Sequence, residues 1–112
     1  MIETVLIDYL KTALHTDHIY AEMPEPSPEE FYVIDKTGSS VVNRICTSTV
    51  AIQSYGASKI RTMEMNEALK DAMEGILSRE EIGACHLSTD YNFSNIAKKQ
   101  HRYQAVFEIT HY

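Results

Sequence analysis

The sequence is short of the features that mark membrane-inserted, exported or nucleic-acid-binding proteins. Its 112 residues hold no apolar run near the roughly 20 residues of a membrane span, and the first residues lack the basic and apolar regions of a signal peptide. Bases are scarce, since 10 Lys and Arg stand against 16 Asp and Glu, for a net charge of −6. Nucleic-acid binding needs bases to displace counterions from phosphate, so we expect no specific nucleic-acid binding and no membrane partner.

The sequence is equally poor in groups that could build a catalytic or metal site. Cys46 and Cys85 lie far apart in apolar stretches, which is typical of reduced, buried thiols. His15 and His18 flank Asp17, but a metal needs three or four convergent ligands and no further candidate follows nearby. No G-x-S-x-G motif occurs. The sequence therefore predicts no metal, no cofactor and no enzymatic activity.

What the sequence does contain is the composition of one globular domain. Hydrophobic residues make up 44% of the chain and charged residues 23%, close to the usual mixture for folded proteins. A chain of this length can bury one core without disulfides or metals and is too short for two. We therefore expect a single domain over residues 1–112.

Two stretches have apolar residues at helical spacing. The first covers residues 2–14, with charged residues on its opposite side. The second starts after Gly56. Residues 56–59 could suggest a phosphate-binding P-loop, but the second glycine of that motif is missing, so we interpret Ser58 as the N-cap of a helix. It runs to about Leu77. The side of this second helix that we expect to be buried consists of Ile60, Met65, Ala68, Leu69, Ala72, Met73, Ile76 and Leu77.

Strand character appears in five further stretches, as aromatic and β-branched residues or as alternation of apolar and polar ones. They are residues 19–22, 31–35, 45–55, 82–89 and 102–110. All three prolines fall within residues 24–28, which predicts a stiff connector, and residues 37–40 have turn composition. In the last strand, alternation assigns four residues to the face under the helices: Tyr103, Ala105, Phe107 and Ile109.

The order of these elements predicts the fold class. The order is a helix, then strands, then a second helix, then strands. This order predicts an α+β two-layer sandwich, with both helices packed on one face of a mostly antiparallel sheet of four to five strands. The opposite face of the sheet is then left to solvent or to partners.

Two segments are candidates for partner binding. One is the polar stretch from Asp90 to His101, whose aromatic and basic residues suggest anchors for a surface or, alternatively, a solvated loop that folds back onto its own sheet. Its candidate residues are Tyr91, Phe93, Ile96, Lys98, Lys99 and Arg102. The second is the loop expected at residues 38–44, with Val41, Val42 and Arg44 near an exposed tip.

Taken together, several stretches resemble the small tail-terminator proteins of siphophages and prophages, also called tail-completion or head-tail joining proteins. The resemblance covers nearly the whole chain and consists of the N-terminal amphipathic helix and residues 20–25, 28–38, 49–56, 90–93 and 102–107. It implies a non-enzymatic α+β subunit of a ring, usually hexameric, at the head-proximal end of the tail tube.

This resemblance also implies partners and a location. The partners would be further copies of the chain, the tail tube protein and the head connector proteins, in a virion assembled in the bacterial cytoplasm. Three other functions stay open at this point: a neighbouring neck protein of the same particles, a standalone binding module, and a small hydrolase with a site that the motifs do not reveal.

Overall fold

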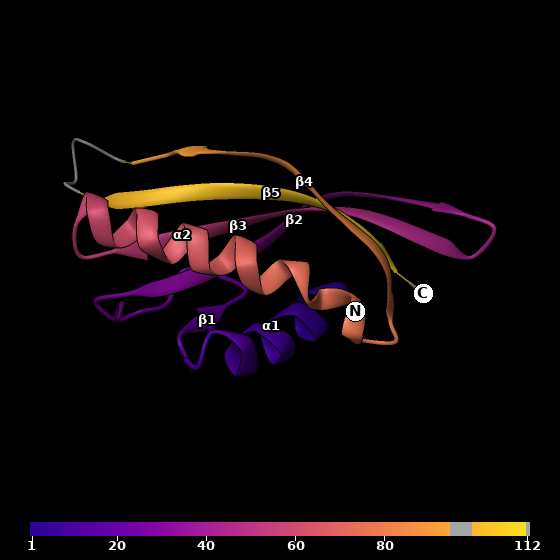
Figure 1. The fold of residues 1–112 in the computed structure, drawn as a ribbon, viewed down its shortest axis with the longest axis horizontal. Coiled ribbons are helices and arrows are strands. Elements are labelled where there is room, and N and C mark those ends of the chain that lie inside the picture. The colour runs from indigo at the N-terminus through magenta and orange to yellow at the C-terminus, as the bar shows by residue number, and fades with distance from the viewer. Residues whose placement is uncertain (95–99, 112) are drawn as a thin grey trace.

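The computed structural model describes residues 1–94 and 100–111. Figure 1 shows its elements, which in chain order are α1 (Ile2–Ala13), β1 (Ile19–Tyr20), β2 (Phe31–Val42), β3 (Ile45–Gly56), α2 (Lys59–Glu74), a 3-10 turn η1 (Ile76–Ser78), β4 (Ile82–Asn92) and β5 (His101–His111). The fold is α+β, with two helices and a five-stranded, mostly antiparallel sheet, as the sequence predicted. Within the described residues, no helix is long and apolar enough to cross a membrane.

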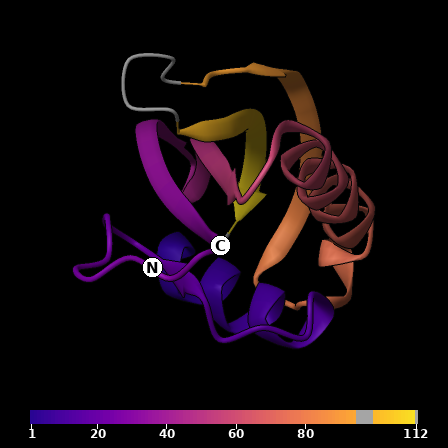
Figure 2. The same ribbon diagram turned by 90° about the vertical axis from the view of Figure 1, so that its left-hand side faces the viewer.

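The sheet has the strand order β1-β2-β3-β5-β4. Among the described residues, the short pair of β1 with β2 is parallel, and the other neighbouring pairs are antiparallel. The chain leaves β3, crosses over through α2 to the edge strand β4, and returns in β5 between β3 and β4. Figure 2, a view along the long axis, shows how strongly the strands turn relative to one another.

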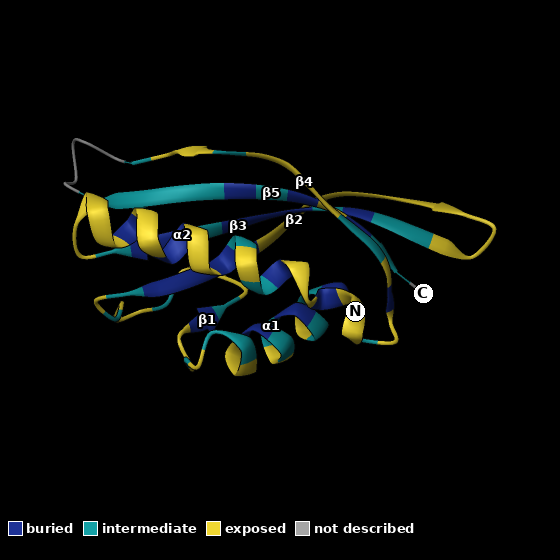
Figure 3. Cartoon of the chain, viewed as in Figure 1, coloured by how far each residue is buried: buried dark blue, intermediate teal, exposed yellow. Residues whose placement is uncertain are grey.

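The main core lies between the helices and one face of this sheet. From α1 it receives Ile2, Leu6 and Leu10, which are four residues apart and so share one side of the helix. Each buried side chain of this size contributes roughly 1.5–3 kcal/mol. From β5 it receives Ala105, Phe107 and Ile109, all buried, so the predicted alternation is confirmed for these three residues, whereas Tyr103 is only half-buried. Figure 3 shows the buried sides of both helices turned toward the sheet.

The predicted buried side of α2 is partly wrong. Met65, Leu69 and Met73 are buried, but Ile60, Ala68 and Leu77 are exposed. At 3.6 residues per turn, Ile60 lies about 180° around the helix from Leu69, so the two cannot share a face. Their places in the core-facing side are taken by two polar residues, Thr62 and Asn66.

The start of α2 is fixed by a cap and a close approach. Ser58 is the N-cap, as predicted, because its Oγ accepts a hydrogen bond from the backbone N–H of Arg61 at 3.1 Å. A Cβ on Gly56 would collide with the Thr62 side chain and lie 2.9 Å from the Thr62 backbone nitrogen. Glycine is therefore what lets β3 end directly beneath the first turn of α2.

The predicted turn at residues 37–40 is wrong. β2 continues to Val42, and the reversal takes place at Asn43 and Arg44, both with positive φ. Positive φ at two central residues is the pattern of a type I′ hairpin turn, whose twist matches that of the strands. Gly38 instead lies at a bulge in β2, and the residues of turn-like composition around it are part of the strand.

Two further expectations need correction. β4 extends to Asn92, because Tyr91 and Asn92 pair with Gln104 and Tyr103 of β5, so the expected loop from residue 90 begins later. The outer face of the sheet is also not wholly bare. A second buried cluster there consists of Phe31, Val33 and Tyr55, with Tyr20 packed against it.

Candidate partner-binding surfaces

The hairpin tip, residues 41–45, forms one end of a molecule that measures 45 × 25 × 24 Å. It extends past both helices at the right-hand end of Figure 1. Val41 and Val42 are 65% and 67% exposed, and Ile45 is also exposed. The predicted exposure of Val41 and Val42 is therefore confirmed, whereas their role in binding stays a prediction.

This end of the hairpin is a two-stranded ribbon with little packed against it. From Asp35 to Val42 every residue of β2 is exposed, and within the described residues this part of β2 pairs with β3 alone. Its other edge is left with backbone N–H and C=O groups that a further chain could bind. The apolar side chains at the hairpin tip are thus not packed into the hydrophobic core.

The second candidate surface holds Tyr91, Phe93 and Arg102, which the structure does bring together. The Arg102 guanidinium lies 4.4 Å from the centre of the Phe93 ring, and its Nε donates to the Phe93 carbonyl at 2.5 Å. The Tyr91 and Phe93 rings meet edge to face at 5.8 Å. Both rings remain exposed. Ile96, Lys98 and Lys99 lie outside the described residues.

Hydrogen bonds across the outer face hold this surface in place. Tyr55 donates to Gln53 Oε1 at 2.6 Å, and Gln53 Nε2 donates to Gln104 Oε1 at 2.8 Å. Gln104 in turn donates to the Tyr91 hydroxyl. Arg102 joins the row by donating to the Tyr55 hydroxyl at 3.3 Å. Arg102 therefore already has partners within its own chain, which the sequence did not indicate.

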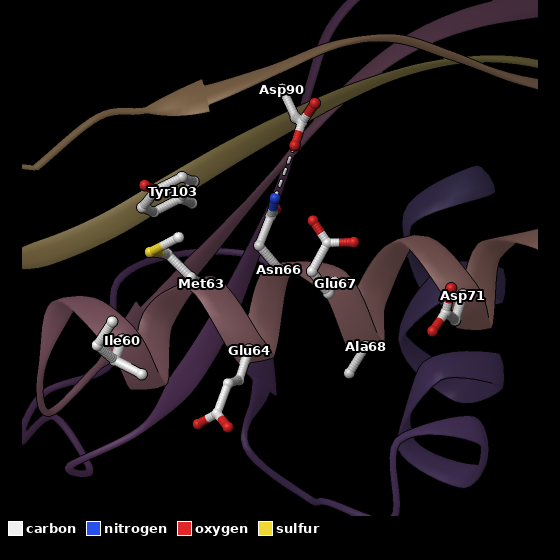
Figure 4. Close-up of a pocket in the computed structure, with 9 residues that line it drawn as sticks. All are labelled: Ile60, Met63, Glu64, Asn66, Glu67, Ala68, Asp71, Asp90 and Tyr103. Carbon is white, nitrogen blue, oxygen red and sulfur yellow. Dashed lines mark hydrogen bonds between the residues drawn. The ribbon is translucent and has the colours of Figure 1, made fainter.

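A third surface was missed by the sequence analysis, and we call it the α2 groove. It is a cavity of about 530 Å³ that opens between the outer side of α2 and the ends of β4 and β5 (Figure 4). It lies toward the end of the molecule opposite the hairpin tip. Its lining residues are Ile60, Met63, Glu64, Asn66, Glu67, Ala68, Asp71, Asp90 and Tyr103.

Polar contacts fix the wall of the α2 groove. Asp90 Oδ2 accepts hydrogen bonds from Asn66 Nδ2 and from Lys70 Nζ, each at 2.9 Å, and Lys70 also contacts Glu67 at 2.8 Å. The hydrogen bond from Lys70 holds the pKa of Asp90 below its usual value, and Glu67 and Asp90 together raise the pKa of Lys70. This polar set ties α2 to the edge strand β4.

Among the described residues, the nearest approach to a catalytic arrangement is a half-buried pair between β3 and β5. Ser48 Oγ and His111 Nε2 are 2.8 Å apart, the separation of a nucleophile and its base. However, Ser48 is only 1% exposed, so a substrate has no access to its hydroxyl. Burial also lowers the pKa of His111. We therefore assign this pair to the packing of β3 against β5.

The described residues also offer no metal-binding cluster and no activated thiol. Among the described residues, no three His, Cys, Asp or Glu side chains gather closely enough to hold a metal ion. Burial raises the pKa of Cys85 to about 11, so its thiol stays protonated and weakly nucleophilic at neutral pH.

No family model matches the chain, and no curated protein matches it.

Proposed function

We propose that this chain is a structural subunit of a (pro)phage tail neck, where copies form a ring that caps the tail tube and joins it to the head. The resemblance of residues 20–25, 28–38, 49–56, 90–93 and 102–107 to tail terminators is the starting point. The observation that carries the proposal is the placement of unfilled surfaces at opposite ends of an elongated subunit: the hairpin tip at one, the α2 groove at the other.

Surfaces at opposite ends favour contacts between unlike patches of neighbouring copies. A two-fold dimer uses the same patch on both copies, whereas a contact between different patches repeats, and it closes into a ring when the rotation allows. β3 leads from Ile45 at the tip to Ser54, which pairs with Tyr103 of the groove wall. Nine residues of strand span about 30 Å, so one copy cannot fold its tip into its own groove.

The charge of the chain suits a ring around the path of a genome. A subunit of net charge −6 attracts DNA poorly, so DNA passes through the ring without being held. The proposed partners are therefore proteins: further copies of the chain, the tail tube protein and the head connector. No step of this function requires a catalytic residue, a metal or a cofactor.

Solution measurements test the proposal directly. We expect native mass spectrometry and sedimentation velocity to show a closed ring, most simply a hexamer, as the concentration rises toward millimolar. Weak contacts repeated around a closed ring gain from multivalency, so dilute protein is expected to be monomeric. A chain that stays monomeric at millimolar concentration, and also when tail tubes are added, would be a standalone binding module instead.

A second measurement separates a tail terminator from other neck proteins. A tail tube protein from the same genome, where one is found, is polymerised with and without the chain, and tube lengths are measured by negative-stain microscopy. A terminator binds tube ends and shortens the length distribution. A ring that leaves the lengths unchanged but binds the head connector identifies a neighbouring neck protein.

A further inference from the structure

Charge is divided unevenly between the hairpin and the rest of the chain. Residues 36–55 contain Lys36 and Arg44 but no Asp or Glu, within a chain of net charge −6. The α2 groove shows the opposite sign, since its described lining includes four acidic residues and no Lys or Arg. The hairpin and the groove are therefore electrostatically complementary, and they lie at opposite ends of the subunit.

We propose that the hairpin tip of one copy of this chain docks in the α2 groove of the next copy. The inference rests on the proposed function, because it specifies the contact through which the ring forms. Val42 and Ile45 pair directly across the two strands of the tip and give it an apolar side. The groove offers Ile60, which is 67% exposed, and Met63 to receive them.

The ionic partners of Arg44 follow from the contacts within one copy. Glu67 and Asp90 are already bound to Lys70. Glu64 lies 3.9 Å from Arg61, at the limit of an ion pair, and most of its side chain is exposed. Asp71 forms no ion pair among the described residues, but it lies eleven residues along α2 from Ile60, whereas Glu64 lies one turn from Ile60. Because the tip is placed against Ile60 and Met63, Glu64 is the groove carboxylate best placed to accept the Arg44 guanidinium. A rim charge pair of this kind favours the correct partner and encounter more than it adds affinity.

Crosslinking gives the first test, because the chain supplies one of the two thiols. Cys46 pairs with Val41 beside the tip. In an Ile60→Cys variant, each copy carries one thiol near the tip and one in the groove, and a short bis-maleimide can join them between copies. We expect a ladder of covalent oligomers that ends at the ring size. A same-patch dimer would give dimers alone and would overturn the inference.

Two variants serve as matched controls for this reaction. Ile60→Cys combined with Cys46→Ser removes the tip thiol but keeps Cys85, so a ladder in that variant would come from Cys85 and count against the proposal. Leu77→Cys places a thiol on another exposed apolar position, in the 3-10 turn η1 that follows α2 and outside the groove lining. It is expected to give no ladder.

A charge exchange gives the second test. Arg44→Glu reverses the charge at the exposed tip and sets it against the acidic groove, so repulsion between like charges is expected to weaken self-association by about tenfold or more, a change readily measured by sedimentation. Adding Glu64→Arg to the same chain should restore much of the loss. Lys36→Glu makes the same change in net charge on an exposed residue of β2, away from the tip, and is expected to leave association nearly unchanged.

The outcomes separate this inference from the function on which it rests. If rings form but Arg44→Glu and Lys36→Glu behave alike, the tip-groove contact is wrong and the ring function stands. If no variant and no wild-type sample associates, with or without tail tubes, the ring function fails together with the contact. If the groove thiol crosslinks only to the added tube protein, the groove binds that partner and the inference between copies is wrong.

Discussion

Replacement of Phe107 by Ala tests the assignment of the core face most directly. Phe107 is 2% exposed in β5, where it pairs with Val50 on one side and Leu87 on the other. Deleting a buried phenyl group costs about 3–5 kcal/mol, depending on how far the site can relax. Phe107 also borders a small pocket of about 120 Å³ that it shares with Met73 and Leu87, so some relaxation is available. We therefore expect a loss of about 3–4 kcal/mol.

That loss is large for a small domain. Total stability is typically about 5–15 kcal/mol, and a domain of this size loses about 4 °C of melting temperature per kcal/mol. Urea unfolding followed by circular dichroism measures the change, provided that the slope with denaturant matches wild type. The control is Val106→Ala on the opposite face of the same strand, expected to cost about 1 kcal/mol or less. Equal costs for both variants would refute the face assignment.

Four further predictions concern other parts of the molecule. Gly56→Ala should lower the free energy of unfolding by about 1–3 kcal/mol, measured in urea, because the new Cβ overlaps Thr62 at the start of α2. Burial lowers the pKa of His111 below its usual 6.5, so the unfolded chain binds the proton more readily. Stability should therefore fall as the pH is lowered from about 6.5, and a His111→Gln variant should show a flatter pH profile in thermal melts. A chain with both Phe93→Ser and Ile96→Ser should melt like wild type but fail in ring assembly or tail completion; a lower melting point with normal assembly would make this surface structural. Fluorescence anisotropy should detect no DNA binding at about 150 mM salt, and micromolar, sequence-independent binding would contradict the charge argument.

Local signals in the sequence were sufficient for the layers of the fold but not for its registers. The period of α1 and the alternation in β5 depend only on which side chains must be buried, and both are confirmed. The hairpin turn was misplaced because residues 37–40 carry turn composition, whereas the pairing of β2 with β3 is set over the whole ribbon. The positive φ at Arg44 could not be predicted, because arginine, unlike glycine or asparagine, is not a residue type that favours this conformation.

The candidate surfaces were predicted unevenly for related reasons. Exposed apolar residues at the tip, Val41 and Val42, stood out because nothing around them suggested a core. Tyr91 and Phe93 were found, but their packing on Arg102 depends on register across β4 and β5, which one strand's sequence does not contain. The α2 groove was missed entirely, because Ile60 was assigned to the core by its apolar character.

Two buried polar residues lie on the core-facing side of α2, where the sequence had placed Ile60. Thr62 donates through Oγ1 to the Ser58 carbonyl at 2.6 Å, and Asn66 Nδ2 donates to Asp90 at 2.9 Å. Both residues are buried, and among the described residues Asn66 Oδ1 has no hydrogen-bond partner. The Thr62 bond lies within the first turn of α2 and turns with the helix, whereas the Asn66 bond joins α2 to β4. The Asn66 bond therefore favours the observed rotation of α2, because a helix turned to bury Ile60 would leave Asp90 without its amide partner and would expose Leu69. A polar residue at a core position usually costs stability unless it is paired. Here the pairing of Asn66 to the edge strand favours the rotation of α2 that places Ile60 on the wall of the groove.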